Sequence, residues 1–282
     1  MNVARDMARA LVPRPIRNWL RSPGDALARV ADELLHAVGA DPEIKLRPGW
    51  QLRCHPAAWR GAYRVHRDDP PQVAELDAFI AACRPGMILF DLGAHYGLFS
   101  LATARYGGPE AVAIAVDPSE HALRMTRLMA RLNGAEARVR TVRAAVAAVE
   151  GTLEMVDVGV QAMGYYVRAD AAHGGRERTV VPTVTVDGLV AATGLAPTHV
   201  KVDVEGFEED ALRGAYATLR SAHPLVFLEL HVALMRAAGK DPGAPVDLLA
   251  GAGYAFTHSD GTLAARGALL TSDLVRIVAR PV

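Results

Sequence analysis

The sequence predicts an α/β fold built on a doubly wound, mostly parallel β-sheet, with an extension at the N-terminus. From Met87 onward, short apolar runs of strand length alternate with longer amphipathic segments, which is the pattern of repeated strand–helix–strand units. A turn containing two glycines follows the first apolar run, as is typical of the first strand of such a sheet. The chain has 282 residues, enough for one large domain or for one domain and an extension.

The first 72 residues differ in pattern from the rest and are predicted to form the N-terminal extension. Prolines are frequent in residues 1–75, and helical apolar spacing occurs only around residues 27–35. An amphipathic helix is expected from about Val73 to Ala82, so the main domain is predicted to span residues 73–282. All the tryptophans of the chain lie in the extension, and this much aromatic surface favours packing as a lid or a dimer contact. They are Trp19, Trp50 and Trp59, with Tyr63 nearby.

The main domain is predicted to contain two groups of alternating elements. In the first group, strands are expected at Met87–Leu92, Ala111–Val116 and Val139–Val146, with a helix from Gly97 and another at Ala122–Leu132. Two segments, Thr152–Val158 and Arg178–Val186, are expected to interrupt the pattern as antiparallel strands. The second group has strands at Thr198–Val204, Pro224–His231, Tyr254–Thr257 and Asp273–Ala279, and helices at Glu209–Leu219 and Val246–Ala252.

Composition excludes several classes of function. The 31 basic and 31 acidic residues give a formal net charge of zero, so no overall field holds a polyanion, and nucleic acid is not expected as a partner. Cys54 and Cys83 alone build neither a disulfide framework nor a thiolate zinc site, which favours a reducing, cytoplasmic location. No apolar run approaches the roughly 18–20 residues that span a bilayer, so integral membrane association is not expected.

The clearest motif is FDLGAHYG, residues 90–97, in which a buried strand ends in a carboxylate and a Gly-x-x-x-Gly turn that opens a helix. Small residues let a ligand approach such a turn, and the start of the helix offers unpaired N–H groups. A dinucleotide site would prefer Gly-x-Gly-x-x-Gly, because the additional glycine admits a pyrophosphate. Asp91 would repel that pyrophosphate but can accept hydrogen bonds from an amine, so the motif favours a nucleoside ligand that carries positive charge.

The second motif is AIAVDPSEHA, residues 113–122, where the next predicted strand ends at Asp117. A carboxylate at the tip of this strand can bind both hydroxyls of a ribose, and its spacing from the glycine turn fits a nucleotide-binding half-fold. Asp117 is therefore the predicted ribose ligand. The alternative is that Asp117 caps the helix that follows Pro118 and Ser119.

Acidic residues also cluster in HVKVDVEGFEEDALRGA, residues 199–215. Asp203 and Glu205 lie at the end of a predicted strand. Ligands of an open α/β sheet bind beyond the carboxyl ends of its strands, so both residues are candidate reactive groups. Glu208 and Glu209 are interpreted instead as charges that complement the dipole at the start of a helix.

Together these motifs resemble the FkbM family of S-adenosylmethionine-dependent methyltransferases, a branch of the class I, Rossmann-like methyltransferases. The resemblance covers about residues 73–260, and its most specific part is the pattern Asp-x-Glu-Gly-x-Glu. The chain departs from the family at His95, where Asn is common, and at Asp117, where Glu is more frequent. The matching positions are Asp91, Gly93, Ala94 and Gly97, then Asp117 and Pro118, then Asp203, Glu205, Gly206 and Glu208, and last Glu229.

The resemblance implies a seven-stranded sheet of the class I methyltransferase type and O-methylation of a hydroxyl on a small molecule, a secondary metabolite or a saccharide. It implies S-adenosyl-L-methionine as the cofactor, with Asp91, Gly93 and Gly97 at its methionine portion and Asp117 at its ribose. The extension would then be a lid, an acceptor-binding segment or the contact of a homodimer. The other positions expected near the cofactor are Ala94, His95, Pro118, Ala144, Ala145 and Asp203.

Methylation of a neutral alcohol needs a base and close positioning of the acceptor oxygen. The candidate bases are Asp203, Glu205 and His231, with Asp203 ranked first and His95 last because His95 lies in the cofactor loop. Asp203, Glu229 and His231 could instead bind a divalent metal that acidifies the hydroxyl. The site without a metal is favoured, because a glycine beside Asp203 suits close approach of a ligand equally well.

Two further classes of function stay open at the level of sequence. A nicotinamide-dependent oxidoreductase could use the same half-fold, although Asp91 and the missing middle glycine disfavour it. A non-catalytic nucleoside-binding scaffold could keep the fold without the chemistry, although the acidic cluster disfavours that. Binding of S-adenosylmethionine or NAD discriminates between these classes.

Overall fold

The structure, a computed structural model, describes residues 23–156 and 178–282. The chain divides into two compact units, Met1–Gly61 and Ala62–Val282. The boundary predicted between residues 72 and 73 falls inside helix α6 (Pro70–Ala82), which begins with two prolines. Prolines fit this position because the first turn of a helix has no intrahelical use for its N–H groups. The role of the extension stays a prediction, and Trp19 lies outside the described residues.

The first unit is described from residue 23 onward. It contains α3 (Pro23–Ala37), an antiparallel hairpin of β1 (Glu43–Arg47) and β2 (Trp50–Arg53), and the short helix α4 (Pro56–Ala58). His55 caps α4, because its side chain accepts a hydrogen bond from the backbone N–H of Ala57. A π-helical turn, η1 (Trp59–Tyr63), leads into the second unit.

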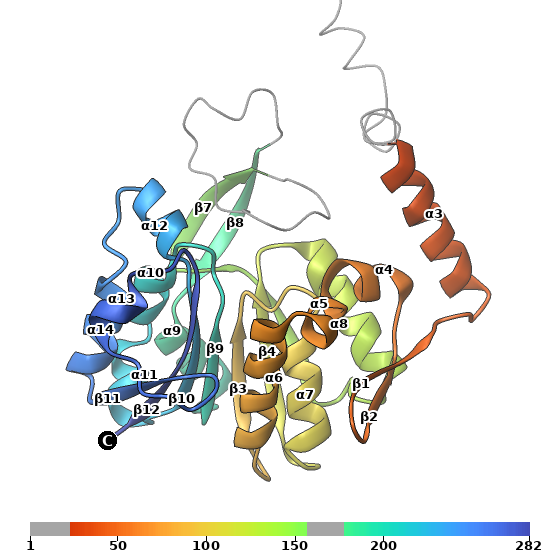
Figure 1. Cartoon of the computed structure of the whole chain (residues 1–282). Helices are drawn as coiled ribbons and strands as arrows, with labels where there is room; N and C mark the ends of the chain where they lie inside the picture. Colours follow the sequence, from red (N-terminus) through yellow and green to blue (C-terminus); the bar gives the residue numbers. More distant parts are fainter. Residues whose placement is uncertain (1–22, 157–177) are drawn as a thin grey trace, which may run out of the picture. The chain divides into compact units, whose positions relative to one another are not determined.

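A seven-stranded sheet forms the centre of the second unit (Figure 1). Strand β12 pairs antiparallel with both of its neighbours, and the other four pairings are parallel. This confirms the predicted doubly wound, mostly parallel fold, whose switch point lies between β3 and β9. In spatial order the strands are β11 (Tyr254–His258), β12 (Val275–Pro281), β10 (Leu225–Leu230), β9 (His199–Val202), β3 (Ile88–Leu92), β4 (Val112–Asp117) and β5 (Val139–Arg143).

Helices cover both faces of this sheet. Helices α9 (Val186–Thr193), α10 (Glu208–Arg213), α11 (Tyr216–Ser221) and α13 (Ala244–Gly251) share one large apolar core with the strands. Helices α6 and α7 (Leu98–Tyr106) lie on the other face, and α8 (Glu120–Leu132) packs on β4 and β5. Short helices complete the unit: α5 (Val65–Asp68), α12 (Val232–Ala237) and α14 (Arg266–Leu269). Within the described ranges, no helix is long and apolar enough to cross a membrane.

Alternation along β9 places polar side chains under α6 and α7. Val200 and Val202 point into the large apolar core, whereas His199 and Lys201 point to the opposite face. The ring of His199 bonds through Nε2 to the carbonyl of Ala82, 3.1 Å away, which fastens α6 to the sheet. A buried lysine therefore occupies the centre of the sheet, next to the switch point.

Two predicted elements are split in the structure. The strand expected at Val139–Val146 becomes β5 and β6 (Ala145–Val146), and β6 joins a separate sheet with β8 (Arg178–Val184) and β7 (Gly151–Val156). β7 and β8 pair antiparallel, as expected, and residues 157–158 of the predicted strand lie outside the described part. The helix expected at Glu209–Leu219 is divided into α10 and α11 at Gly214 and Ala215, and a Cβ atom on Gly214 would lie 2.3 Å from the carbonyl oxygen of Ala147.

Candidate active site

The glycine turn after β3 lies against the loop that follows β9. Gly93 has φ +76°, and a Cβ atom on it would lie 1.8 Å from the backbone oxygen of Asp203. Gly97 has φ +73° and precedes the first turn of α7, where a Cβ atom would lie 2.5 Å from Cγ2 of Thr126. Contacts within the protein therefore favour glycine at both positions, and the approach of the cofactor to this turn stays a prediction.

Two residues other than glycine adopt a left-handed backbone in these facing loops. They are His95, with φ +49°, and Glu205, with φ +47°. Such conformations cost about 1–3 kcal/mol and are concentrated at functional sites. The His95 ring stacks on Tyr96 with centroids 4.0 Å apart, and burial lowers the pKa of His95 to about 4. His95 is therefore neutral at pH 7, and it is held in place by its loop.

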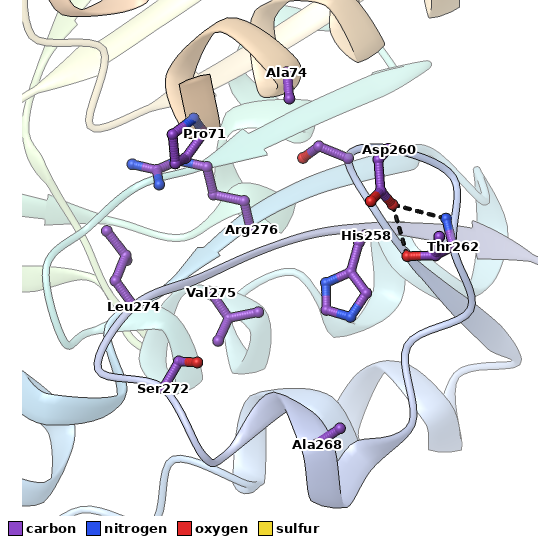
Figure 2. Close-up of a pocket in the computed structure, with 11 residues that line it drawn as sticks. Pro71, Ala74, His258, Asp260, Thr262, Ala268, Ser272, Leu274, Val275 and Arg276 are labelled. Atoms are coloured by element: carbon purple, nitrogen blue, oxygen red, sulfur yellow. Dashed lines mark hydrogen bonds between the residues drawn. The ribbon is translucent and has the colours of Figure 1, made fainter. Parts of the chain in front are cut away.

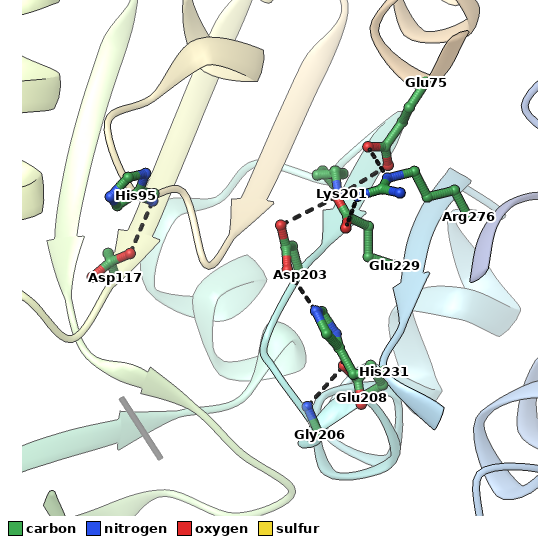
Figure 3. Close-up of polar contacts among 10 residues, drawn as sticks. All are labelled: Glu75, His95, Asp117, Lys201, Asp203, Gly206, Glu208, Glu229, His231 and Arg276. Atoms are coloured by element: carbon green, nitrogen blue, oxygen red, sulfur yellow. Dashed lines mark hydrogen bonds and ion pairs between the residues drawn. The ribbon is translucent and has the colours of Figure 1, made fainter. Parts of the chain in front are cut away.

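Asp117 joins the loops that follow β3 and β4. Its Oδ2 accepts a hydrogen bond from the backbone N–H of His95 at 2.9 Å (Figure 3). Its Oδ1 accepts one from the N–H of Ser119 at 2.8 Å. Burial raises the pKa of Asp117 to about 7, although both hydrogen bonds favour the charged form. The cap of α8 is Ser119, whose Oγ accepts from the N–H of Ala122 at 3.2 Å. The alternative of Asp117 as the helix cap is therefore wrong.

The remaining positions expected near the cofactor lie at the carboxyl ends of β3, β4 and β5. Oδ2 of Asp91 accepts from both the N–H and the hydroxyl of Ser100, at 3.1 and 2.7 Å, and burial raises the pKa of Asp91. The N–H of Ala144 donates to the carbonyl of Asp117, so Ala144 lies beside the predicted ribose ligand. Contact of this set with a cofactor stays a prediction. The other buried members are Ala94, Pro118 and Ala145.

Asp203, His231 and Glu208 form a connected group at the carboxyl ends of β9 and β10 (Figure 3). The Asp203 side chain is 34% exposed, and its Oδ1 lies 3.7 Å from Nε2 of His231. Nδ1 of His231 is 2.7 Å from Oε1 of Glu208. Burial favours the neutral ring, but the hydrogen bond to Glu208 and the charge of Asp203 raise the pKa of His231. Burial and Glu229 raise the pKa of Asp203, against the opposing effects of Lys201 and His231.

Glu208 has a different role from the one expected at the start of a helix. It is fully buried, and its Oε1 also accepts from the backbone N–H of Gly206 at 2.9 Å. Glu208 thus fixes the turn after β9 and orients the ring of His231. Glu209, by contrast, pairs with Arg213 one turn along α10 at 2.7 Å, as a surface charge should.

The metal-binding alternative has a geometric basis but an unfavourable electrostatic setting. Asp203, Glu229 and His231 offer donor atoms that all lie within 4.8 Å of one another. Both oxygens of Glu229 are engaged by cations, Oε1 by Lys201 at 3.1 Å and Oε2 by Arg276 at 2.8 Å. Two fixed cations repel a third, so the arrangement favours the site without a metal, which stays a prediction.

Three charged residues of this region were missed by the sequence analysis. They are Glu75 of α6, Lys201 of β9 and Arg276 of β12, which join Glu229 in a buried cluster (Figure 3). Lys201 carried a signal in the sequence, since a lysine between the valines of a buried strand is rare unless it is paired. Glu75 and Arg276 carried none, because their pairing depends on how α6 and β12 pack.

A pocket of about 340 Å³ opens beside this cluster, at the carboxyl end of β11 and the start of β12 (Figure 2). Arg276 both lines the pocket and contacts Glu229, so this residue connects the pocket to the buried cluster. Its lining mixes apolar side chains with polar ones, and the polar ones include His258, Ser259, Asp260, Thr262 and Ser272. Small-molecule sites in proteins start at about this size.

The fold and the site together define a class I, S-adenosylmethionine-dependent methyltransferase. The defining features are the strand order, the antiparallel strand β12 beside β10, and the acidic residues at the ends of β3, β4 and β9. The methyltransferase FkbM domain model matches residues 91–256, which is more than half of the chain. The chain therefore belongs to the FkbM methyltransferase family. No curated protein matches the sequence.

Solved structures with a similar fold are distant in sequence. The methyltransferase FkbM from Methylobacillus flagellatus is 13% identical with a TM-score of 0.44, and the match covers 79% of this chain and 53% of that one. This chain thus spans about half the length of that protein. A TehB-like methyltransferase from Corynebacterium glutamicum is 13% identical, with a TM-score of 0.44 and coverage of 79% and 94%. Fibrillarin from Aeropyrum pernix, solved with bound S-adenosyl-L-methionine, is 11% identical, with a TM-score of 0.42 and coverage of 70% and 67%.

Proposed function

We propose that this methyltransferase moves the methyl group of S-adenosylmethionine to a hydroxyl oxygen of a small molecule, a secondary metabolite or a saccharide. The observation that carries the proposal is the Asp203 carboxylate, a partly exposed group at the edge of a buried charged cluster. An alcohol loses its proton as its oxygen is methylated, and a positioned carboxylate with a raised pKa is suited to accept that proton. The proposed O-methylation therefore uses as its base the Asp203 carboxylate, which stays partly exposed in the fold.

The residues at the ends of β3 and β4 fit the cofactor. Each oxygen of Asp117 accepts one backbone hydrogen bond and keeps capacity for a ribose hydroxyl. Because burial raises the pKa of Asp117 to about 7, additional donors would stabilise its charged form. Oδ1 of Asp91 can accept from the ammonium group of the methionine portion, while Oδ2 binds Ser100. When bound, S-adenosylmethionine supplies an electrophilic methyl group on a positively charged sulfur.

In this proposal Asp203 accepts the proton of the acceptor hydroxyl, and the neighbouring side chains hold Asp203 for that step. Glu208 bonds Nδ1 of His231, which turns Nε2 toward Oδ1 of Asp203. His231 can therefore align the carboxylate or serve as the base itself. Glu205, in the strained turn two residues after Asp203, is the third candidate.

The pocket beside Arg276 supports a small, polar acceptor. Its volume of about 340 Å³ is enough for part of a small molecule, and its lining offers hydroxyl, imidazole and carboxylate groups. Such groups exchange hydrogen bonds with the hydroxyls of a sugar or another oxygen-rich compound. We expect the portion of the acceptor that is not methylated to bind there.

The test is a screen for methyl transfer from isotopically labelled S-adenosylmethionine to saccharides, alcohols and phenols, with an RNA included as a competing class of acceptor. Label on the oxygen of a hydroxyl compound supports the proposal. Label on nitrogen or carbon, or on the RNA alone, contradicts it. Calorimetry separates the alternatives, because binding of NAD alone indicates an oxidoreductase, and cofactor binding without turnover of any acceptor indicates a scaffold.

Asp117→Ala should weaken binding of S-adenosylmethionine and S-adenosylhomocysteine by about ten- to a hundredfold. Loss of a charged hydrogen-bond partner costs roughly 1.5–3 kcal/mol, and the ribose hydroxyls would lose theirs. Calorimetry with each ligand measures the effect.

The matched control for this variant is Asp187→Ala. Asp187 also accepts backbone hydrogen bonds near the start of a helix, from Ala217 at 3.0 Å and Thr218 at 2.8 Å, but it lies at α9 and α11. The control should bind both ligands as the parent does. Equal affinity in parent and Asp117→Ala would remove Asp117 from the cofactor site.

A further inference from the structure

Four buried or nearly buried side chains form a closed charge ring next to Asp203 (Figure 3). Lys201 Nζ lies 3.1 Å from Oε1 of Glu75 and 3.1 Å from Oε1 of Glu229. Arg276 closes the ring, with Nε 3.2 Å from Oε2 of Glu75 and Nη2 2.8 Å from Oε2 of Glu229. The formal charges of the four residues cancel.

The protonation states of Lys201 and Glu75 keep the charge ring from adding negative charge to the site. Burial opposes the charged form of Lys201, but Glu229 and Glu75 together raise its pKa, so Lys201 stays positive. Burial raises the pKa of Glu75, which makes Glu75 the member that most readily takes a proton. The charge ring is therefore neutral or positive, and in neither state negative.

Stability alone does not explain the charge ring. Removing charges from water costs about as much as their attraction returns, and well-packed apolar side chains often stabilise a core equally well. The four members come from four separate elements, α6, β9, β10 and β12. Glu75 and Arg276 also lie outside residues 91–256, the segment that the family model matches. An electrostatic effect of the charge ring on a neighbouring group is the better explanation for its presence.

Lys201 is the member of the charge ring that faces Asp203. The two residues stand two positions apart at the end of β9 and so share a face, with Nζ 3.8 Å from Oδ2 of Asp203. The other charged groups around Asp203 are His231, Glu229 and Glu205. Both oxygens of Glu229 are already paired. Lys201 therefore supplies a fixed positive charge on the sheet side of Asp203, opposite His231.

We propose that Lys201 is a positioning residue that keeps the Asp203 carboxylate charged and in place at the methyl-transfer site, and that Glu75 and Arg276 hold Lys201 there. The inference rests on the proposed function of Asp203 as a base. Without the charge of Lys201, burial and Glu229 act on Asp203 with less opposition, and its carboxyl keeps a proton to higher pH. A protonated Asp203 accepts no proton from a hydroxyl.

The variants separate the charge of Lys201 from the stability of the ring. Lys201→Met alone leaves two carboxylates without their shared cation and can fail to fold. The double variant Lys201→Met/Glu75→Gln removes one charge of each sign and leaves Glu229 paired with Arg276. Lys201→Arg keeps the positive charge. Arg266→Met is the matched control, because it removes a cation from an exposed pair with Asp247.

Carboxyl-carbon NMR of aspartate-labelled protein, with Asp203 assigned from Asp203→Asn, measures the pH at which Asp203 is protonated. We expect the double variant to raise this pH by about one unit or more, which is tenfold in proton affinity. Lys201→Arg and Arg266→Met should stay close to the parent. At neutral pH, kcat for the hydroxyl acceptor should fall about tenfold in the double variant, with KM for S-adenosylmethionine unchanged.

The NMR titration of Asp203 tests the role of Lys201, whereas the assay for methyl transfer tests the proposed function. An Asp203 carboxyl that titrates in the double variant as it does in the parent overturns the role of Lys201. A parent enzyme that methylates no hydroxyl compound refutes the proposed function, and the NMR titration still shows whether Lys201 controls the charge of Asp203.

Discussion

Gly93→Ala is expected to lower the free energy of unfolding by about 2–5 kcal/mol and to abolish binding of S-adenosylmethionine. The added Cβ atom would lie 1.8 Å from the backbone oxygen and 2.9 Å from the carbonyl carbon of Asp203, and backbone atoms cannot swing aside as a flexible side chain can. Overpacking of this kind costs about 1–3 kcal/mol, and a left-handed backbone adds about 1–2 kcal/mol for alanine. Denaturant unfolding and calorimetry with the cofactor measure the two effects.

Gly86→Ala separates the effect of the left-handed backbone from the effect of the steric clash on the free energy of unfolding. Gly86 also has a left-handed backbone, with φ +74°, but a Cβ atom on it would meet nothing within 4 Å. This control should cost only about 1–2 kcal/mol and bind the cofactor normally. If Gly93→Ala is no less stable than Gly86→Ala and binds S-adenosylmethionine as the parent does, the loops after β3 and β9 do not approach as described.

The sheet could be predicted from the sequence because each buried strand has its own apolar run and a clear stop. The residue pairs that bring the loops after β3 and β9 together could not be predicted from the sequence. Gly93 is visible as a turn glycine, but its partner, the carbonyl of Asp203, lies more than a hundred residues along the chain. The local pattern therefore suggested only a ligand as the neighbour of Gly93, whereas the fold also places the loop after β9 against it. Packing between β3 and β9 supplies information that local sequence does not contain.

The candidate site shows the same division between local and tertiary information. Asp203 and His231 could be identified because each ends a strand, and the carboxyl ends of parallel strands meet at one edge. Glu208 was misinterpreted, since only the fold shows that it turns inward to bond Nδ1 of His231. Complementing the helix dipole is the more frequent use of an acidic residue at that position, so local reasoning favoured it.

The polar side of the sheet also could not be predicted from the strand pattern. In β9, alternate residues face opposite layers, and Lys201 faces α6 and α7 together with His199. The sequence predicts a strand at Thr198–Val204 but no partner for this lysine. Its partners, Glu75 and Glu229, come from α6 and β10, and only the assembled fold brings them within 3.1 Å of Nζ.

Asp203→Asn is expected to lower the rate of methyl transfer by roughly a hundredfold or more while affinity for S-adenosylmethionine stays near that of the parent. Asparagine keeps the shape of the side chain but removes its charge and its capacity to accept a proton, which are the properties that a base needs. General-base contributions are typically 10²–10⁴-fold, and His231, 3.7 Å away, can supply part of the lost function. Single-turnover rates with a hydroxyl acceptor from the screen, together with calorimetry, separate the two quantities.

Asp210→Asn is the matched control for this prediction. Asp210 also pairs with a lysine, Lys240, and its side chain is 36% exposed, close to the 34% of Asp203. The control should keep the parent rate. Chelation tests the metal-binding alternative in the same assay, because a metal-dependent parent would lose activity and a parent with an uncomplexed base would not. Full activity in both Asp203→Asn and Glu205→Gln would refute catalysis by this cluster and leave His231 and His95 as the bases to test.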